Sequence, residues 1–221
     1  MDLFRPVDLY CERQGPEFWA EPLNFLSNGA FLIAAAYFCL RHWRQVSRHW
    51  QLQLLLALLT AVGIGSGLFH SFAQLWSQLA DVIPIGLLVV FYIICYYRYV
   101  ESWGPAKVLF GVLVFLVMTA VFALAVPKGW FNGSQTYFPV LINLLFMGKT
   151  HQDSNARPLV FAAAATFFLA LMARSVDMAM CEVLSVGTHY VWHTLCAITI
   201  YLMLTLLIRD RAFRGDVGQS N

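Results

Sequence analysis

The chain has 221 residues, of which 60% are hydrophobic and only 12% are charged, and its mean hydropathy is +0.66. Soluble domains are about 45–50% apolar and about 25% charged, so this composition excludes an ordinary soluble domain and indicates an integral membrane protein. A formal net charge of +2 without a dense basic stripe excludes a nucleic-acid-binding protein, because such proteins need clustered cations to neutralise phosphates.

Seven apolar stretches approach the roughly 20 residues that a helix needs to cross the hydrocarbon core of a bilayer. They are residues 23–43, 51–72, 80–99, 106–126, 135–149, 158–180 and 188–208, of which the fifth is the shortest. Lipid cannot hydrogen-bond the backbone, and the stretches lack the alternation of a barrel, so all seven are expected to be helices. The predicted fold is all-α: a single domain over residues 1–221 with seven transmembrane helices.

The Lys and Arg residues at the ends of these stretches and outside them, Arg174 apart, are distributed unevenly between the two sides of the membrane. Ten fall on one side, at positions 41, 44, 48, 98, 107, 149, 157, 209, 211 and 214, whereas Arg5, Arg13 and Lys128 fall on the other. Because cytoplasmic loops carry the excess of positive charge, residues 1–22 are predicted to form an outer segment and residues 209–221 a cytoplasmic tail. In a bacterial cell the membrane would be the inner membrane.

Polar side chains interrupt the apolar sequence near the outer ends of the predicted helices. The stretch "GIGSGLFHSFAQLWSQLAD" places Ser66 and His70 near the outer end of the second helix and Asp81 near the outer start of the third. In the last helix, "HYVWH" places His189 and His193 at the outer start. These five residues are expected to share one depth, where ionisable groups are costly and usually functional.

Four further polar residues fall in the same predicted layer. Asn24 and Asn28 lie at the outer start of the first helix, and Arg174 and Asp177 lie at the outer end of the sixth. Arg174 and Asp177 are three residues apart on a helix, so they are expected to form a structural ion pair inside the membrane.

The three outer histidines have the pattern of a metal site. His189 and His193 are four residues apart, which places them on one helical face. Catalytic zinc commonly has three protein ligands and a water molecule, and His70 is the natural third ligand because the other histidines fall in predicted cytoplasmic loops. Asp81 could accept a proton from the zinc-bound water, whose pKa falls to about 7, and Ser66 could stabilise an oxyanion.

Other interpretations fit the same residues. The HxxxH pair could simply hydrogen-bond neighbouring helices. Ser66, His70 and Asp81 could instead form a protease-like triad, although that assignment leaves His189 and His193 without a role. A lipid receptor or transporter would use the same polar layer to bind a ligand or a proton without cleaving a bond.

Three motifs in order carry a resemblance to a known family. They are "DLYCERQGPEFWAEPLNFLSN", "GIGSGLFHSFAQLWSQLAD" with its S-x3-H-x10-D spacing, and "HYVWH". Together they resemble the alkaline ceramidases, within a wider group of seven-helix membrane hydrolases that includes the adiponectin receptors. The resemblance implies zinc bound by His70, His189 and His193, with Asp81 acting on the water and Ser66 on the oxyanion. It also implies the activity, a zinc-dependent amidase that hydrolyses ceramide-like N-acyl sphingoid lipids to a fatty acid and a free long-chain base.

The resemblance also implies calcium in the N-terminal segment, where family members bind it through acidic residues. The matching oxygen ligands are Asp8, Glu12 and Glu21, with Asn24 as a further candidate. Calcium takes six to eight oxygen ligands. The interval between the "CE" and "AE" pairs is shorter than in the animal pattern, and an acidic solvated loop is the alternative.

The five cysteines fall into two groups. Cys39, Cys95 and Cys196 lie within the spans or toward the inner face, where a thiol usually acts as a small apolar side chain. Cys11 and Cys181 fall on the predicted outer side, an oxidising space if it is a periplasm or an organelle lumen. The resemblance implies a disulfide between these two, which would tie the N-terminal segment to the connection before the last helix.

Overall fold

The computed structural model describes residues 2–127, 129–210 and 212–213, and in these residues the regular structure is helical. The α-helices are α1 (Pro22–Ser27), α2 (Gly29–Arg41), α3 (Trp43–Arg48), α4 (Trp50–Phe72), α5 (Leu75–Cys95), α6 (Pro105–Ala125), α7 (Phe138–Thr150), α8 (Arg157–Val176) and α9 (His189–Arg209). A π-helical turn, Tyr96–Val100, continues α5, and 3-10 turns at Ser134–Tyr137 and Met178–Met180 precede α7 and follow α8.

Among the described residues, six helical segments are long and apolar enough to cross a membrane. They are Pro22–Arg41, Trp50–Phe72, Leu75–Val100, Pro105–Ala125, Arg157–Val176 and His189–Arg209. They correspond to six of the seven predicted spans, and the protein is an integral membrane protein. The remaining span, predicted over residues 135–149, corresponds to a 3-10 turn followed by α7. With 13 residues, α7 is about 20 Å long, shorter than the hydrocarbon core of about 30 Å.

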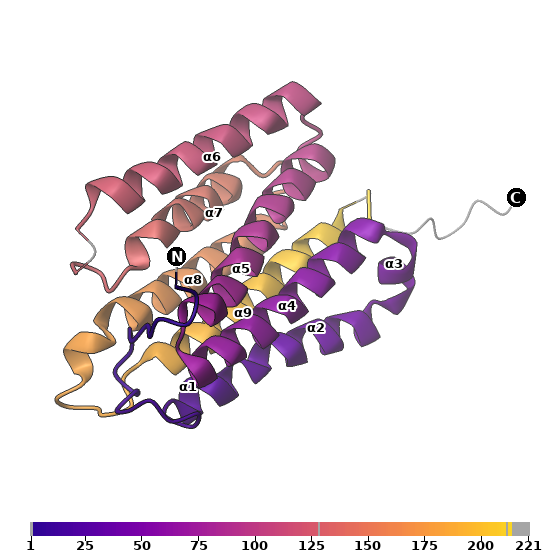
Figure 1. The fold of residues 1–221 in the computed structure, drawn as a ribbon. Helices are drawn as coiled ribbons and strands as arrows, with labels where there is room; N and C mark the ends of the chain where they lie inside the picture. Colours follow the sequence, from indigo (N-terminus) through magenta and orange to yellow (C-terminus); the bar gives the residue numbers. More distant parts are fainter. Residues whose placement is uncertain (1, 128, 211, 214–221) are drawn as a thin grey trace, which may run out of the picture.

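The helices form an elongated bundle (Figure 1), and each helix from α2 to α9 contributes buried residues to its core. α4 packs along α5, α8 packs along α9, and α2 contacts both α4 and α9. α6 and α7 lie on one side of the bundle, where α7 returns the chain from the end of α6 to the start of α8 (Figure 1). The N-terminal segment, α1 and the α8–α9 connection gather at one end of the bundle, which we call the N-terminal end.

Glycines in α4 allow close helix contacts beside the polar residues. A Cβ atom on Gly65 would collide with the backbone carbonyl of Ala80 in α5, and one on Gly63 would lie 2.9 Å from the side chain of Leu32 in α2. Small residues permit such approach between membrane helices. The contact at Gly65 therefore sets the distance between α4 and α5 next to Ser66 and Asp81.

The short turn between α4 and α5 brings their polar residues to the same end of the bundle. Ala73 ends α4 in a left-handed conformation with φ of 44°. Gln74 and Ser77 then form a capping box at the start of α5, in which each side chain bonds to the backbone of the other residue. His70 and Asp81 consequently lie on either side of this turn at the N-terminal end.

Two links fasten the N-terminal segment to the α8–α9 connection. Cys11 and Cys181 form the disulfide that the resemblance implied. Asp177 accepts the backbone N–H of Cys11 at 3.0 Å through Oδ2 and, through Oδ1, those of Thr188 at 2.7 Å and His189 at 2.9 Å. The first N–H groups of a helix have no partner within it, so Asp177 caps α9.

Candidate functional site

Three histidines meet at the N-terminal end of the bundle. α4 contributes His70 and α9 contributes His189 and His193, all of them buried. One ring nitrogen from each lies within 4.8 Å of the other two, which is close enough for all three to bind one ion. In the part of the chain that the structure describes, no other three His, Cys, Asp or Glu side chains come together in this way.

The partners of these histidines are those expected of metal ligands. Nδ1 of His70 lies 2.6 Å from Oε2 of Glu21, and Nδ1 of His193 lies 2.7 Å from the hydroxyl of Ser27. The Nε2 atoms of the two rings face each other at 3.2 Å. Metal-binding histidines usually donate their second N–H to a carboxylate or another acceptor, which turns the other nitrogen to the metal. Nδ1 of His189 is buried without a hydrogen-bond partner, so the donor set fits a metal ion.

Asp81 and Ser66 line a polar pocket together with His189 and His193. Asp81 is 8% exposed, and its Oδ1 has no hydrogen-bond partner. A buried carboxylate oxygen without a partner is costly, and a water molecule or a polar substrate group in the pocket would satisfy it. The five residues that the sequence analysis placed at one depth are thus neighbours here.

The protease-like triad is not formed. Both ring nitrogens of His70 have other neighbours, Glu21 at Nδ1 and His193 at Nε2. Neither nitrogen is left to take a proton from Ser66, so His70 cannot act as its base in this arrangement.

Arg174 faces the polar pocket, and the predicted ion pair with Asp177 is wrong. Its Nη1 donates a hydrogen bond to the hydroxyl of Tyr10. Its guanidinium carbon lies 5.3 to 5.6 Å from the ring centroids of Tyr10, Tyr137 and Trp192. Asp177 is unavailable because backbone amides at Cys11 and at the start of α9 occupy both of its oxygens.

Tyr10 is a site residue that sequence reasoning missed. Its ring stacks on His189 with centroids 3.6 Å apart and an interplanar angle of 15°. Burial raises the pKa of Tyr10, although the charge of Arg174 opposes the shift, so the phenol stays protonated at neutral pH. The available signal was its position next to Cys11, because the disulfide to Cys181 brings residue 10 to the connection that precedes α9.

In the described residues, the carboxylates expected to bind calcium are not gathered as a group that could hold one ion. Asp8 is exposed, and the carboxylates of Glu12 and Glu21 have other partners. Glu12 accepts the backbone N–H groups of Leu23 at 2.7 Å and Asn24 at 2.8 Å. Burial raises the pKa of Glu12, and these two hydrogen bonds oppose the shift.

Glu21 instead links the N-terminal segment to the histidines. Its Oε1 accepts from Arg13, and its Oε2 lies within hydrogen-bond distance of His70 and Asn24. Burial alone would raise the pKa of Glu21, but its bonds to His70, Asn24 and Arg13 hold that pKa below its ordinary value. Asn24 and Asn28, which were expected in the polar layer, are buried beside it at the start of the first span.

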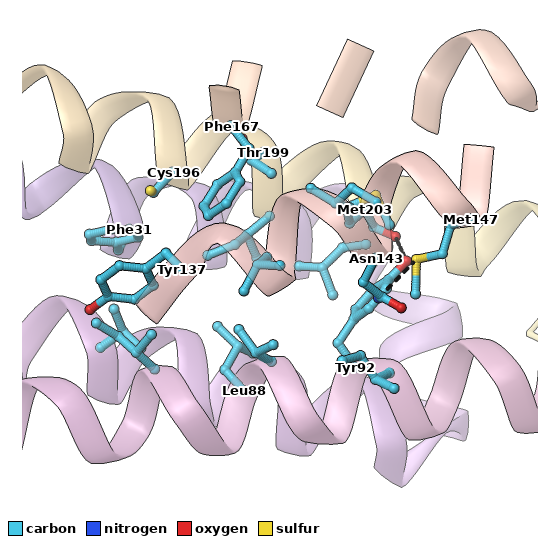
Figure 2. Close-up of a pocket in the computed structure, with 18 of the residues that line it drawn as sticks. Phe31, Leu88, Tyr92, Tyr137, Asn143, Met147, Phe167, Cys196, Thr199 and Met203 are labelled. Carbon is cyan, nitrogen blue, oxygen red and sulfur yellow. Dashed lines mark hydrogen bonds between the residues drawn. The ribbon is translucent and has the colours of Figure 1, made fainter. Parts of the chain in front are cut away.

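An apolar pocket adjoins the polar one (Figure 2). Phe31, Tyr137 and Trp192 line both pockets. From Phe31 and Tyr137 the apolar pocket runs to Met147 and Met203 at its far end (Figure 2). His193 and Met203 lie on the same helix, α9, ten residues apart, so the far end is about 15 Å below the histidines at 1.5 Å per residue.

Comparison with known proteins covers nearly the whole chain. A family model described as Ceramidase matches residues 9–219. The match includes each site residue named above except Asp8. No curated protein matches the chain.

Proposed function

Because the chain belongs to the ceramidase family, we propose that it is a zinc-dependent intramembrane amidase acting on ceramide-like N-acyl sphingoid lipids. Hydrolysis of the amide would give a fatty acid and a free long-chain base. The observation that carries the proposal is the group of three buried histidines beside Asp81, whose Oδ1 has no partner.

The residues of the pocket suggest how the amide is hydrolysed. His70, His189 and His193 would hold zinc, which when bound supplies Lewis-acid activation of water and of a carbonyl group. Asp81 would take a proton from the attacking water and return it to the leaving amine. The hydroxyl of Ser66 would donate a hydrogen bond to the oxygen of the substrate carbonyl as negative charge develops there.

The adjoining apolar pocket supports a lipid substrate. An amide next to the histidines would leave one hydrocarbon chain of the substrate in the pocket between Phe31 and Met203 (Figure 2). Burying apolar surface supplies the binding free energy, at about 0.8 kcal/mol for each methylene group.

We further infer seven crossings, with the N-terminal end of the bundle outside the cytoplasm. α7 and the 3-10 turn before it would make the seventh crossing, since they return the chain between the ends of the bundle (Figure 1). The Cys11–Cys181 disulfide supports an oxidising compartment at this end. Three of the basic residues counted above, Lys128, Arg211 and Arg214, lie outside the described residues. A reporter fused to the C-terminus should be cytoplasmic, and finding it outside would reverse the orientation.

The test combines metal analysis with a hydrolysis assay on purified protein. Wild type should hold about one zinc ion per chain and release fatty acid from N-acyl sphingosines. His193→Ala should lose both zinc and hydrolysis, because one of three ligands is gone. His42→Ala is the matched control, since His42 lies at the opposite end of the bundle next to Phe38 and should keep both. A wild type that binds lipid amides but releases no fatty acid with zinc present would favour a receptor or transporter.

A further inference from the structure

Arg13 lies buried between the N-terminal segment and the end of α4, with 8% of its surface exposed. Its Nε donates to Oε1 of Glu21 at 2.6 Å, and its Nη2 donates to the backbone carbonyl of His70 at 2.9 Å. Its Nη1 donates to the carbonyl of Gly15 at 3.0 Å and approaches that of Glu17 at 3.5 Å. One carboxylate and three carbonyl oxygens therefore surround the guanidinium.

These are the kinds of oxygen atom that calcium takes as ligands. The carboxylate most deeply buried among the expected calcium ligands, that of Glu21, is already neutralised by Arg13. A guanidinium remains charged at any ordinary pH, so a divalent cation beside Glu21 would be repelled by a fixed positive charge. Within the described residues, the carboxylates of Asp8, Glu12 and Glu21 are not gathered as a metal-binding group.

We propose that Arg13 takes the place of a calcium ion in the N-terminal segment, because its guanidinium binds the Glu21 carboxylate and backbone carbonyl oxygens around it. The protein then needs no calcium for its stability. Arg13 contacts neither the polar pocket nor a ring nitrogen of the histidines, so it is a positioning residue. It fixes the Glu21 carboxylate that bonds Nδ1 of His70, and it also binds the backbone of His70.

The first test is the response of the full-length wild type to calcium. Its thermal unfolding midpoint, measured in detergent micelles, should be the same with excess calcium chloride and with EGTA. Zinc is added to the EGTA sample to keep free zinc constant, because EGTA also binds zinc. A higher midpoint with calcium in the wild type would overturn the proposal. This measurement uses no substrate, so its outcome is independent of the proposed hydrolysis.

The second test replaces the cation. Arg13→Gln leaves Glu21 buried without a positive partner, so the unfolding midpoint should fall, and added calcium should restore part of the loss. Loss of an outer partner of a ligand typically lowers metal affinity about 10- to 100-fold, and zinc affinity should fall in that range. Arg13→Lys keeps a positive charge and should remain insensitive to calcium. Arg5→Gln is the matched control, because Arg5 is exposed in the same segment.

The outcomes of the second test are equally decisive. Unchanged zinc affinity in Arg13→Gln would show that Arg13 does not position His70. A loss of stability that calcium does not restore would show that the oxygen atoms around Arg13 cannot accept a metal in its place. If Arg13→Gln does not fold, the calcium response of wild type and of Arg13→Lys still decides the proposal.

Discussion

Asp81 differs from the other buried carboxylates at the N-terminal end in the partners of its oxygens. Glu12, Glu21 and Asp177 each have both oxygens in hydrogen bonds, and these bonds fasten the backbone or a histidine. Asp81 has one buried oxygen without a partner, and the residue lines a pocket that Ser66 also lines. A buried polar atom left unpaired in a native structure needs a reason, and proton transfer in the pocket is one.

Asp81→Asn should therefore lower hydrolysis without unfolding the protein. The amide is nearly isosteric and the three histidines are untouched, so zinc content and lipid binding should survive. Hydrolysis should fall by about 10² to 10⁴, the usual contribution of a positioned acid or base. Zinc content, lipid affinity and fatty-acid release would be measured on one preparation, with Asp153→Asn in an exposed loop as the control. Loss of zinc along with activity would instead assign Asp81 to holding the metal.

At the same scale, sequence spacing was enough to find the histidines but not the partners of Arg174. His189 and His193 share a face because a helix repeats every 3.6 residues. The predicted common depth in the membrane was the only reason to choose His70 as the third ligand. Whether Arg174 pairs with Asp177 or with Tyr10 depends on the backbone amides of Cys11 and His189, which occupy the Asp177 carboxylate. The positions of these amides are set by the folded connection between α8 and α9.

The contact between α4 and α5 sets the geometry of the site at the scale of elements. Hydropathy located both helices, because it counts apolar residues over a long window. It also marked residues 135–149 as the shortest stretch, but it did not show that this stretch begins within the 3-10 turn Ser134–Tyr137, which leaves α7 only 13 residues long. Nor does "GIGSG" say which glycine meets a neighbour. The structure identifies Gly65, which lies against the backbone of Ala80.

Gly65→Ala should separate α4 from α5 and displace Asp81 from the histidines. The added Cβ meets backbone rather than a movable side chain, and overpacking of this kind costs typically about 1–3 kcal/mol. Thermal stability should fall and hydrolysis should drop by at least about tenfold, because small misplacements of reacting groups cost large factors in rate. Gly86→Ala in α5 is the control, since its Cβ meets no atom within 4 Å. Equal effects of the two substitutions would contradict this role for Gly65.

For the whole molecule, the apolar pocket is the feature that sequence could not predict. Leu87 and Leu88 are identical neighbours in α5, yet Leu87 is 55% exposed and Leu88 is 5% exposed. Leu88 lines the pocket, midway between Phe31 and Met203 (Figure 2). In a membrane helix, residues that face lipid and residues that line a lipid-binding cavity are both apolar, so hydropathy cannot separate them. Only the packing of six helices around this space distinguishes the two leucines.

Leu88→Trp should block the middle of the pocket and change which substrates are hydrolysed. An acyl chain denied burial of about four methylenes would lose about 3 kcal/mol, or roughly 100-fold in kcat/KM. Short-chain amides, which need less of the pocket, should be hydrolysed at nearly the wild-type rate. The matched control is Leu87→Trp on the exposed face of the same helix. Rates would be measured for a series of N-acyl sphingosines of increasing chain length. A uniform loss at every length would mean that the variant disturbs the metal centre, whereas no loss at any length would place the substrate chain outside this pocket.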